Sequence, residues 1–309
     1  AFAIGEDNAR NIGVNVRRAK LTVLVAVSVL IGVCVSVGGT IGFVGLVTPH
    51  MVRMLSGPNH KRLLPASMLS GATFLLLACS FALFLALEDG AAFAGMTDGE
   101  KALIAYFIMG RSVNSRNRIF ERFEDGLRTK AFDESKLSDP SLIIYNPFLT
   151  LENVDIITNG DQTNTVYDYI KSGSTFEEAL FTREFEPDAP NFTPRISGVN
   201  FYDYETASFE YTLSILKSSE GDPSACQRFF YNYSPIAGKG HFIHTYKCDG
   251  DPIPSFEGEP EAVSLPDSAK ELADIVWENL NCENKVSLFV RSVSLCDGKT
   301  DEIVINKNK

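Results

Sequence analysis

Three arginines within eight residues are the side chains of this sequence best suited to bind a charged ligand. Arg111, Arg116 and Arg118 follow an apolar run that ends at Gly110, and serine and asparagine residues lie between them. The run predicts a buried strand that ends in a polar, cationic rim. Guanidinium groups bind planar anions and phosphates through paired hydrogen bonds. The spacing therefore predicts an anion-binding site at a strand end, with an ordinary solvated rim as the alternative.

Other polar residues lie where later strands are expected to end. They are Tyr145, Asn159, Gly160, Asp161, Glu186 and Arg195. Binding residues concentrate in loops that a rigid sheet holds in place. Each residue also has a simpler interpretation: Tyr145 as a core tyrosine, Asp161 as a helix cap and Glu186 as an exposed acid. Taken together, they predict a small-molecule site with cationic, phenolic and carboxylate groups.

Charge is unevenly distributed along the 309 residues. Residues 1–87 hold seven Lys/Arg against two Asp/Glu, whereas residues 88–309 hold 21 Lys/Arg against 37 Asp/Glu, a balance of −16. An acidic second half argues against nucleic acid as its partner, because neutralising phosphates requires a basic face. A small anionic ligand held by a local arginine cluster stays compatible with this balance.

Several classes of site have no signature in the sequence. There is no GxGxxG or GxxxxGK[ST] phosphate loop, no GxSxG elbow and no HExxH motif. The six cysteines are scattered without CxxC spacing, which predicts reduced thiols. His241 and His244 are three residues apart, so on a strand they point to opposite faces and are not expected to bind one metal ion. The sequence thus predicts neither a metal site nor a cofactor.

The pattern of elements after residue 90 favours an α+β domain. Strands are expected at about 91–95, 102–109, 142–146, 154–158, 195–202, 207–217, 226–233, 240–247, 285–295 and 301–306. Asp161 is placed to cap a helix that runs to about Tyr169, Thr175 and Glu178 form a capping box for a second helix, and a third is expected over 267–280. Strands in runs and helices in separate blocks indicate layers rather than alternating βαβ units.

The first 87 residues look like a different protein. Two uncharged apolar runs, 21–39 and about 68–87, have the length and composition of bilayer-spanning helices. This predicts an all-α, transmembrane segment. The alternative is a pair of buried helices in a large soluble core.

The segment over about 4–78 contains GEDNARNIGV and, after the first apolar run, GTIGFVGLVTPHMVRMLSGPNHKRLLPASMLSGATFLLLA. It resembles the permease subunit of iron-siderophore and cobalamin ABC importers. In that family, the stretch similar to residues 42–53 is the cytoplasmic loop that docks on the ATPase. The resemblance stops at Cys79, so we expect a truncated permease segment that performs no translocation by itself.

A second set of motifs covers nearly all of 90–309: IAYFIMGRSVNSRNRIF, DPSLIIYNPF, IITNGDQTNTVYDYI, TFEEALFTREFEPDAPNFTPRISG, GKGHFIHTYKCDGDPIPSFEGEP and NKVSLFVR. They resemble the archaeal-type IMP cyclohydrolase family and its bacterial members. The resemblance implies an αββα sandwich of the N-terminal-nucleophile-hydrolase type. It also implies closure of 5-formamidoimidazole-4-carboxamide ribonucleotide (FAICAR) to IMP with loss of water, the last step of purine synthesis, without a cofactor.

The same resemblance assigns roles to individual residues. Arg116 would orient the substrate and stabilise the oxyanion, Tyr145 would donate to the formyl oxygen, and Glu186 would assist proton transfer. A shift of register between Arg116 and Arg118 stays open. The expected substrate contacts are Arg111, Arg118, Asn159, Gly160, Asp161 and Arg195.

The sequence therefore predicts two domains, a membrane segment over 1–87 and an IMP cyclohydrolase-like domain over 88–309. The catalytic domain is expected in the cytoplasm, and the first segment in a membrane if it inserts. The rival interpretations are an importer permease component with a soluble nucleotide-binding tail, and an interaction domain that has lost catalysis. Oligomeric state stays open, a homo-oligomer included.

Overall fold

The computed structural model describes residues 90–137, 140, 143–248 and 250–308. Before residue 90 it describes only residues 15, 16, 18, 20–22, 25, 28, 52–54 and 65–70. The chain divides into two compact units, Ala1–Ser80 and Phe81–Lys309. Most of the expected spans 21–39 and 68–87 lie outside the described residues. Within the described part of the chain, no helix has both the length and the apolarity needed to cross a bilayer.

The second unit contains two antiparallel sheets. The first has six strands, in spatial order β11 (Glu261–Ser264), β10 (Lys239–His244), β1 (Ala91–Met96), β2 (Lys101–Met109), β12 (Lys285–Ser294) and β13 (Thr300–Asn306). The second has seven, in spatial and chain order β3 (Arg118–Phe123), β4 (Gly126–Ala131), β5 (Phe148–Leu151), β6 (Val154–Thr158), β7 (Arg195–Asp203), β8 (Ser208–Ser219) and β9 (Asp222–Tyr233).

Alternation along β2 explains why this sheet is buried on both sides. Ala102, Ile104, Tyr106 and Ile108 pack between the two sheets, whereas the intervening residues pack into a separate outer core. Successive side chains of a strand point to opposite faces. A nine-residue strand that is apolar at almost every position therefore joins two cores.

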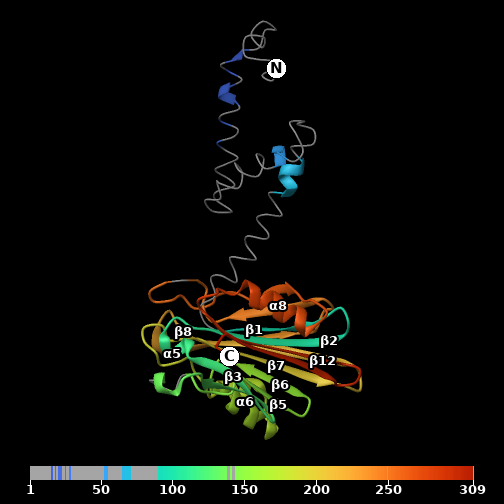
Figure 1. Cartoon of the computed structure of the whole chain (residues 1–309). Helices are drawn as coiled ribbons and strands as arrows, with labels where there is room; N and C mark the ends of the chain where they lie inside the picture. Colours follow the sequence, from blue (N-terminus) through green and yellow to red (C-terminus); the bar gives the residue numbers. More distant parts are fainter. Residues whose placement is uncertain are drawn as a thin grey trace. The chain divides into compact units, whose positions relative to one another are not determined.

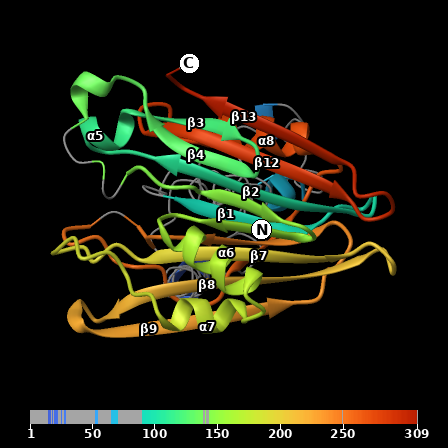
Figure 2. The same ribbon diagram turned by 90° about the horizontal axis from the view of Figure 1, so that it is seen from below.

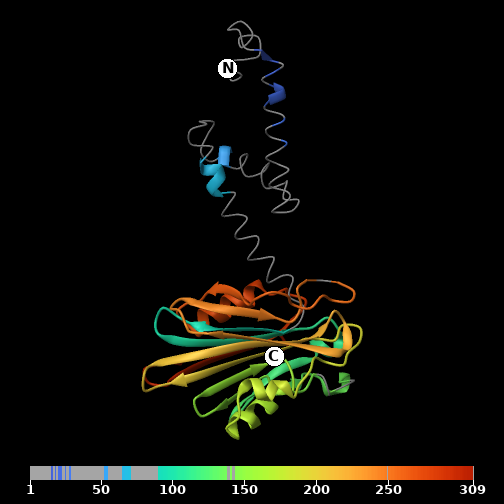
Figure 3. The ribbon, with the colours of Figure 1, turned by 180° about the vertical axis from the view of Figure 1, so that it is seen from behind.

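Helices cover the outer face of each sheet. α8 (Ala269–Asn279) packs on the six-stranded sheet through residues such as Leu272 and Val276. α6 (Gln162–Lys171) and α7 (Phe176–Phe181) pack on the seven-stranded sheet through Val166 and Leu180. Figures 1 and 3 show the orange α8 on one outer side and the yellow-green α6 and α7 on the other, and Figure 2 shows α6 and α7 over β7 and β8. The layers of this unit are thus helix, sheet, sheet and helix, which confirms the α+β class.

Local capping signals position α7 and α8 as expected. Thr175 accepts from the Glu178 amide while the Glu178 carboxylate accepts from the Thr175 amide, so the predicted capping box is confirmed. Ser268 caps α8 through the Glu271 amide. Asp161 occupies the N-cap position of α6, but its side chain makes no capping hydrogen bond. The predicted cap is wrong because two arginines bind that carboxylate instead.

The strand expected over 142–146 is also wrong. The described residues 143–147 are turn and irregular backbone, and β5 begins only after Pro147, at Phe148. Tyr145 is nevertheless bound to β4, because its amide donates to Thr129 Oγ1 at 2.8 Å and its carbonyl accepts from the Thr129 amide at 2.8 Å. The Thr129 hydroxyl thus accepts the hydrogen bond that a backbone carbonyl would accept in a regular pair of strands.

Besides the strands β3, β4 and β11, two short elements on either side of the β3–β4 hairpin are additions to the expected set. Residues between β2 and β3 form the four-residue helix α5 (Val113–Arg116), and a 3-10 turn, η2 (Glu134–Lys136), follows β4. Ser112 caps α5 by accepting from the Ser115 amide. The arginine-rich stretch is therefore a capped turn followed by a strand, not a continuous loop.

Candidate active site at one end of the sandwich

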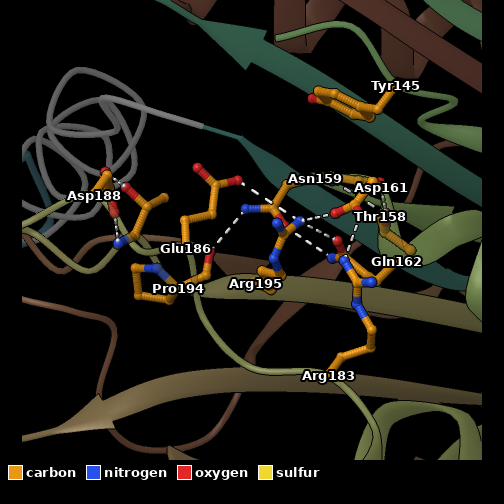
Figure 4. A network of polar contacts seen from close by, with 12 residues as sticks. Tyr145, Thr158, Asn159, Asp161, Gln162, Arg183, Glu186, Asp188, Pro194 and Arg195 are labelled. Carbon is orange, nitrogen blue, oxygen red and sulfur yellow. Dashed lines mark hydrogen bonds and ion pairs between the residues drawn. The ribbon is translucent and has the colours of Figure 1, made fainter. Parts of the chain in front are cut away.

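Arg195 is the centre of a group of polar residues at the end of β6 and the start of β7. It is 7% exposed, and its Nη1 donates to Gln162 Oε1 at 2.7 Å. The same nitrogen lies 2.9 Å from Asp161 Oδ1 and 3.7 Å from Glu186 Oε1. Figure 4 shows these side chains converging on the guanidinium from both sides. The guanidinium plane of Arg195 is therefore fixed by oxygens of three residues from two segments, the start of α6 and the loop that contains Glu186.

Gly160 allows that approach because it has no side chain. A Cβ atom built on Gly160 would lie 1.9 Å from Arg195 Nη1 and 2.6 Å from Gln162 Oε1, closer than any real Cβ contact. Glycine is the residue that permits such close packing of backbone and side chain. Any side chain at position 160 would occupy the space that the Arg195 guanidinium fills.

Asn159 fixes the backbone on both sides of Arg195. Its Nδ2 donates to the Pro194 carbonyl at 2.9 Å, and its Oδ1 accepts from the Ile196 amide at 2.9 Å and from Gln162 Nε2 at 3.2 Å. The side-chain amide thereby ties the end of β6 to the start of β7. The structure gives Asn159 a positioning role, and direct contact with substrate stays a prediction.

Asp161 balances the positive charge of the group. Its Oδ2 lies 2.5 Å from Arg183 Nη2, and its Oδ1 faces Arg195. Burial by itself would raise the pKa of the Asp161 carboxyl, but Arg195 and Arg183 together lower it further, so the pKa lies below the ordinary value of an aspartate. Asp161 is thus ionised across the physiological range.

This shift predicts a pH-dependent loss of stability in Asp161→Asn. A carboxyl whose pKa is lowered on folding stabilises the native state above its unfolded pKa, and that contribution disappears as the pH falls through the folded pKa. We expect the variant to unfold at lower urea concentration than wild type at pH 7, with the difference shrinking below about pH 4. Urea titrations from pH 7 to pH 3 measure this, and Asp168→Asn, on the exposed face of α6, controls for removing one negative charge. A difference that persists unchanged at pH 3 would contradict the ion-pair assignment.

Glu186 lies in a loop that is braced against the sheet. It is 8% exposed, and its amide donates to the Thr193 carbonyl at 2.9 Å. The Thr193 amide in turn donates to Asp188 Oδ1 at 2.6 Å, and its hydroxyl pairs with Tyr246 Oη at 2.7 Å. These bonds hold a proline-bounded loop in one conformation, so the carboxylate of Glu186 is preorganised beside Arg195.

Tyr145 is the phenol that the sequence predicts for the site. It is 8% exposed, and its hydroxyl lies 2.9 Å from that of Tyr106 on β2. In Figure 4 the Tyr145 hydroxyl points toward the side on which the Glu186 carboxylate lies, with Arg195 and Asp161 on the facing elements. The Tyr145 hydroxyl is paired with that of Tyr106, and a catalytic role for its phenol together with the Glu186 carboxylate stays a prediction.

The three arginines of the capped turn have different surroundings. Arg116 is exposed, with Nε donating to the Gly110 carbonyl at 2.7 Å and Nη2 to Asn284 Oδ1 at 2.6 Å. Arg118 is 5% exposed, and it donates to the carbonyls of Ser115 and Met109. Arg111 is exposed in the turn after β2. Arg118 thus holds the turn together, and a substrate role for any of the three stays a prediction.

The predicted residues therefore form two groups. Contacts join Asn159, Gly160, Asp161, Glu186 and Arg195, whereas Tyr145 is hydrogen-bonded to Tyr106 and Thr129. The three arginines lie between the end of β2 and the start of β3, five or more residues beyond Tyr106.

Sequence reasoning does not single out Arg183, Gln162 or Tyr106, which the structure adds to the site. Arg183 lies inside the motif over 175–198, so the sequence does show a positive charge close to Glu186. Its pairing with Asp161 has no sequence signal, because the two residues come from different loops.

Comparison with known proteins separates the two units. Residues 1–89 match the FecCD transport family. An uncharacterized ABC transporter permease of Bacillus subtilis is 55% identical over 74 residues, 24% of this chain and 21% of that protein. A hemin transport system permease of Yersinia pestis is 49% identical over 79 residues, 26% of this chain and 24% of that protein. A cobalamin import permease of Halobacterium salinarum is 46% identical over 84 residues, 27% of this chain and 23% of that protein. The chain thus spans about a quarter or less of the length of these curated relatives.

The larger unit matches a different family. The model of the IMP cyclohydrolase-like protein family covers residues 91–298, well over half of the chain, and includes every residue of the site described above. Over this range the chain belongs to the IMP cyclohydrolase-like protein family.

Proposed function

We propose that the second unit closes FAICAR to IMP with release of water. The observation that carries this proposal is the Glu186 carboxylate 3.7 Å from the buried Arg195 guanidinium, in a chain of this family, with the Tyr145 hydroxyl pointing toward the same side in Figure 4. We also propose that the sandwich is of the N-terminal-nucleophile-hydrolase type, used without a covalent intermediate.

The reaction requires little more of the protein than positioning of the reacting groups and proton transfer. The carboxamide nitrogen attacks the formyl carbon, a C–N bond forms, and that nitrogen loses one proton. The formyl oxygen then leaves as water while the formamido nitrogen loses a second proton. Both reacting groups belong to one molecule, so the protein mainly has to hold them aligned. A general acid for the oxygen and a general base for nitrogen complete the requirement.

The site residues fit these tasks. Tyr145 would donate to the formyl oxygen as it gains charge, and Glu186 would take the proton from the attacking nitrogen. Arg195, fixed by Asp161 and Gln162, would bind an oxygen of the substrate. Arg116, Arg111 and Arg118 are proposed to orient the nucleotide and to stabilise the oxyanion from the end of β2.

The direct test is turnover of FAICAR by the purified full chain, followed by chromatography of the nucleotide product. Appearance of IMP in proportion to protein supports the proposal. Binding of IMP without turnover would favour a nucleotide sensor, and neither binding nor turnover would favour an interaction domain. Either of those results would reject the cyclohydrolase proposal.

Gly160→Ala tests whether the Arg195 group serves this reaction. The added methyl group would displace the guanidinium, and a displacement of about 1 Å at a reacting site can cost about 100-fold in rate. We expect kcat/KM for FAICAR to fall about 10-fold to 100-fold. Gly99→Ala, whose Cβ would meet only Thr97 Oγ1 at 3.7 Å, is the matched control and should keep the wild-type rate. A fully active Gly160→Ala protein would remove Arg195 from the mechanism.

The permease-like segment supports a second candidate function. The match of residues 1–89 to a transport family is consistent with an importer component whose tail binds nucleotides. We favour catalysis by a cytoplasmic second unit that does not depend on residues 1–87. Cell fractionation and comparison of the full chain with residues 88–309 distinguish the two. A shortened protein that regains activity only when residues 1–87 are added back would refute independence.

A further inference from the structure

A second tyrosine lies against the catalytic phenol proposed above. Tyr106 comes from the middle of β2, is 1% exposed, and faces the core between the sheets. Its hydroxyl oxygen is 2.9 Å from the Tyr145 hydroxyl oxygen, so one hydroxyl donates to the other. The two residues are 39 positions apart in sequence. Tyr106 belongs to β2 of the six-stranded sheet, and Tyr145 lies in the segment that is bound to β4 of the seven-stranded sheet. Their hydroxyls therefore join the two sheets of the sandwich.

The Tyr106 hydroxyl has little freedom to move. Its ring is stacked on Phe120, with centroids 6.0 Å apart. A Cβ built on Gly90 would lie 2.6 Å from the Tyr106 hydroxyl, so the glycine leaves just the space that this hydroxyl occupies. Gly90 itself is held by Thr245, whose Oγ1 donates to the Gly90 carbonyl at 2.7 Å. Tyr106 is thus fixed by packing on two sides.

We propose that Tyr106 is a positioning residue that donates its proton to the Tyr145 oxygen and thereby aims the Tyr145 proton at the substrate. A phenol has one proton, so a Tyr145 that donates to substrate has to use its oxygen as the acceptor toward Tyr106. As Tyr145 gives up its proton, negative charge grows on its oxygen. A hydrogen bond to a charged acceptor is stronger than one to a neutral acceptor, so the Tyr106 bond would strengthen in the transition state.

This inference rests on the proposed function, and Tyr106→Phe tests it in the full chain. We expect kcat for FAICAR to fall about tenfold, with KM little changed, because the lost bond strengthens only during reaction. The alkaline fall of the kcat–pH profile should also move to higher pH. Tyr145 has to be protonated to donate, and without Tyr106 its phenolate loses a stabilising donor and forms at higher pH.

A matched control and a second variant separate positioning from packing. Tyr211→Phe removes another hydroxyl of the same core, one paired with His241 Nδ1 at 2.7 Å, and should leave the pH profile unchanged. Gly90→Ala displaces the Tyr106 hydroxyl without altering either tyrosine, so it should lower kcat in wild type and much less in the Tyr106→Phe background.

The outcomes distinguish this inference from the proposed function. Wild-type protein that does not cyclise FAICAR rejects the proposed function. Active wild type, with Tyr106→Phe showing the same kcat and the same alkaline limb, overturns the role of Tyr106 alone. A loss of kcat in Tyr106→Phe with no shift of that limb, or additive effects of Gly90→Ala and Tyr106→Phe, would also overturn it. Thermal unfolding of each variant confirms that folded proteins are compared.

Discussion

Glu186→Gln is expected to lower kcat for FAICAR about 10²–10⁴-fold, the range in which general acid–base catalysis contributes to enzymatic rates. Glutamine has the same length as glutamate and still presents an oxygen toward Arg195, so the substitution removes the base while preserving the shape of the site. KM should change little, because the carboxylate is proposed to act on the moving proton rather than on the resting substrate. Steady-state kinetics of the purified variant give both constants.

Glu184→Gln is the matched control for this prediction. Glu184 belongs to the same loop, but its side chain is 67% exposed and lies 4.0 Å from Arg228. We expect it to retain the wild-type rate. A Glu186→Gln protein with full activity would remove Glu186 from the mechanism, and equal losses in both variants would indicate that the loop's conformation, rather than one carboxylate, was disturbed.

The parts of this site that sequence reasoning predicts are those set by local pattern. The capping box of Thr175 and Glu178 and the buried strand over 102–109 depend on neighbours within a few residues, and both are confirmed. The expectation that polar residues at strand ends belong together also follows from local pattern, because antiparallel strands begin and end at the same edges. In the structure, Arg195 lies 2.9 Å from Asp161, and the amide of its neighbour Ile196 donates to Asn159.

What the sequence leaves out depends on contacts between distant segments. Nothing near Asp161 indicates that Arg183 would bind its carboxylate instead of a helix amide, and nothing near Tyr145 indicates Tyr106. The β3–β4 hairpin is a different case. The exposed Arg128 and Lys130 alternate with the buried Leu127 and Thr129, and a glycine follows Asp125 at the turn. This alternation is typical of a strand, but the strands expected from the sequence do not include it.

We expect the largest effect on stability from breaking a buried ion pair between the two sheets. Arg291 on β12 donates through Nε to Asp155 Oδ2 on β6 at 2.8 Å, and it also pairs with Glu302 on β13. Asp155 is fully buried, and burial raises the pKa of its carboxyl against the opposing effects of Arg291 and the Tyr202 hydroxyl. Arg291→Met would leave this carboxylate without its cation. Removing one partner of a buried pair costs about 3–5 kcal/mol. We expect that loss in urea unfolding at pH 7.

The pH dependence of Arg291→Met shows whether the unpaired carboxylate is the cause. A carboxyl whose pKa is raised on folding destabilises the native state above its unfolded pKa, and the penalty shrinks as the pH falls and the folded form binds a proton. The variant should therefore recover stability relative to wild type between neutral pH and about pH 4. Adding Asp155→Asn should restore much of the loss at pH 7 and abolish the recovery, because no buried charge is left.

Arg128→Met, which breaks the exposed pair with Glu121, is the control and should change stability little. A loss in Arg291→Met that is independent of pH and unaffected by Asp155→Asn would instead assign the effect to packing against Phe148, over whose ring the guanidinium lies.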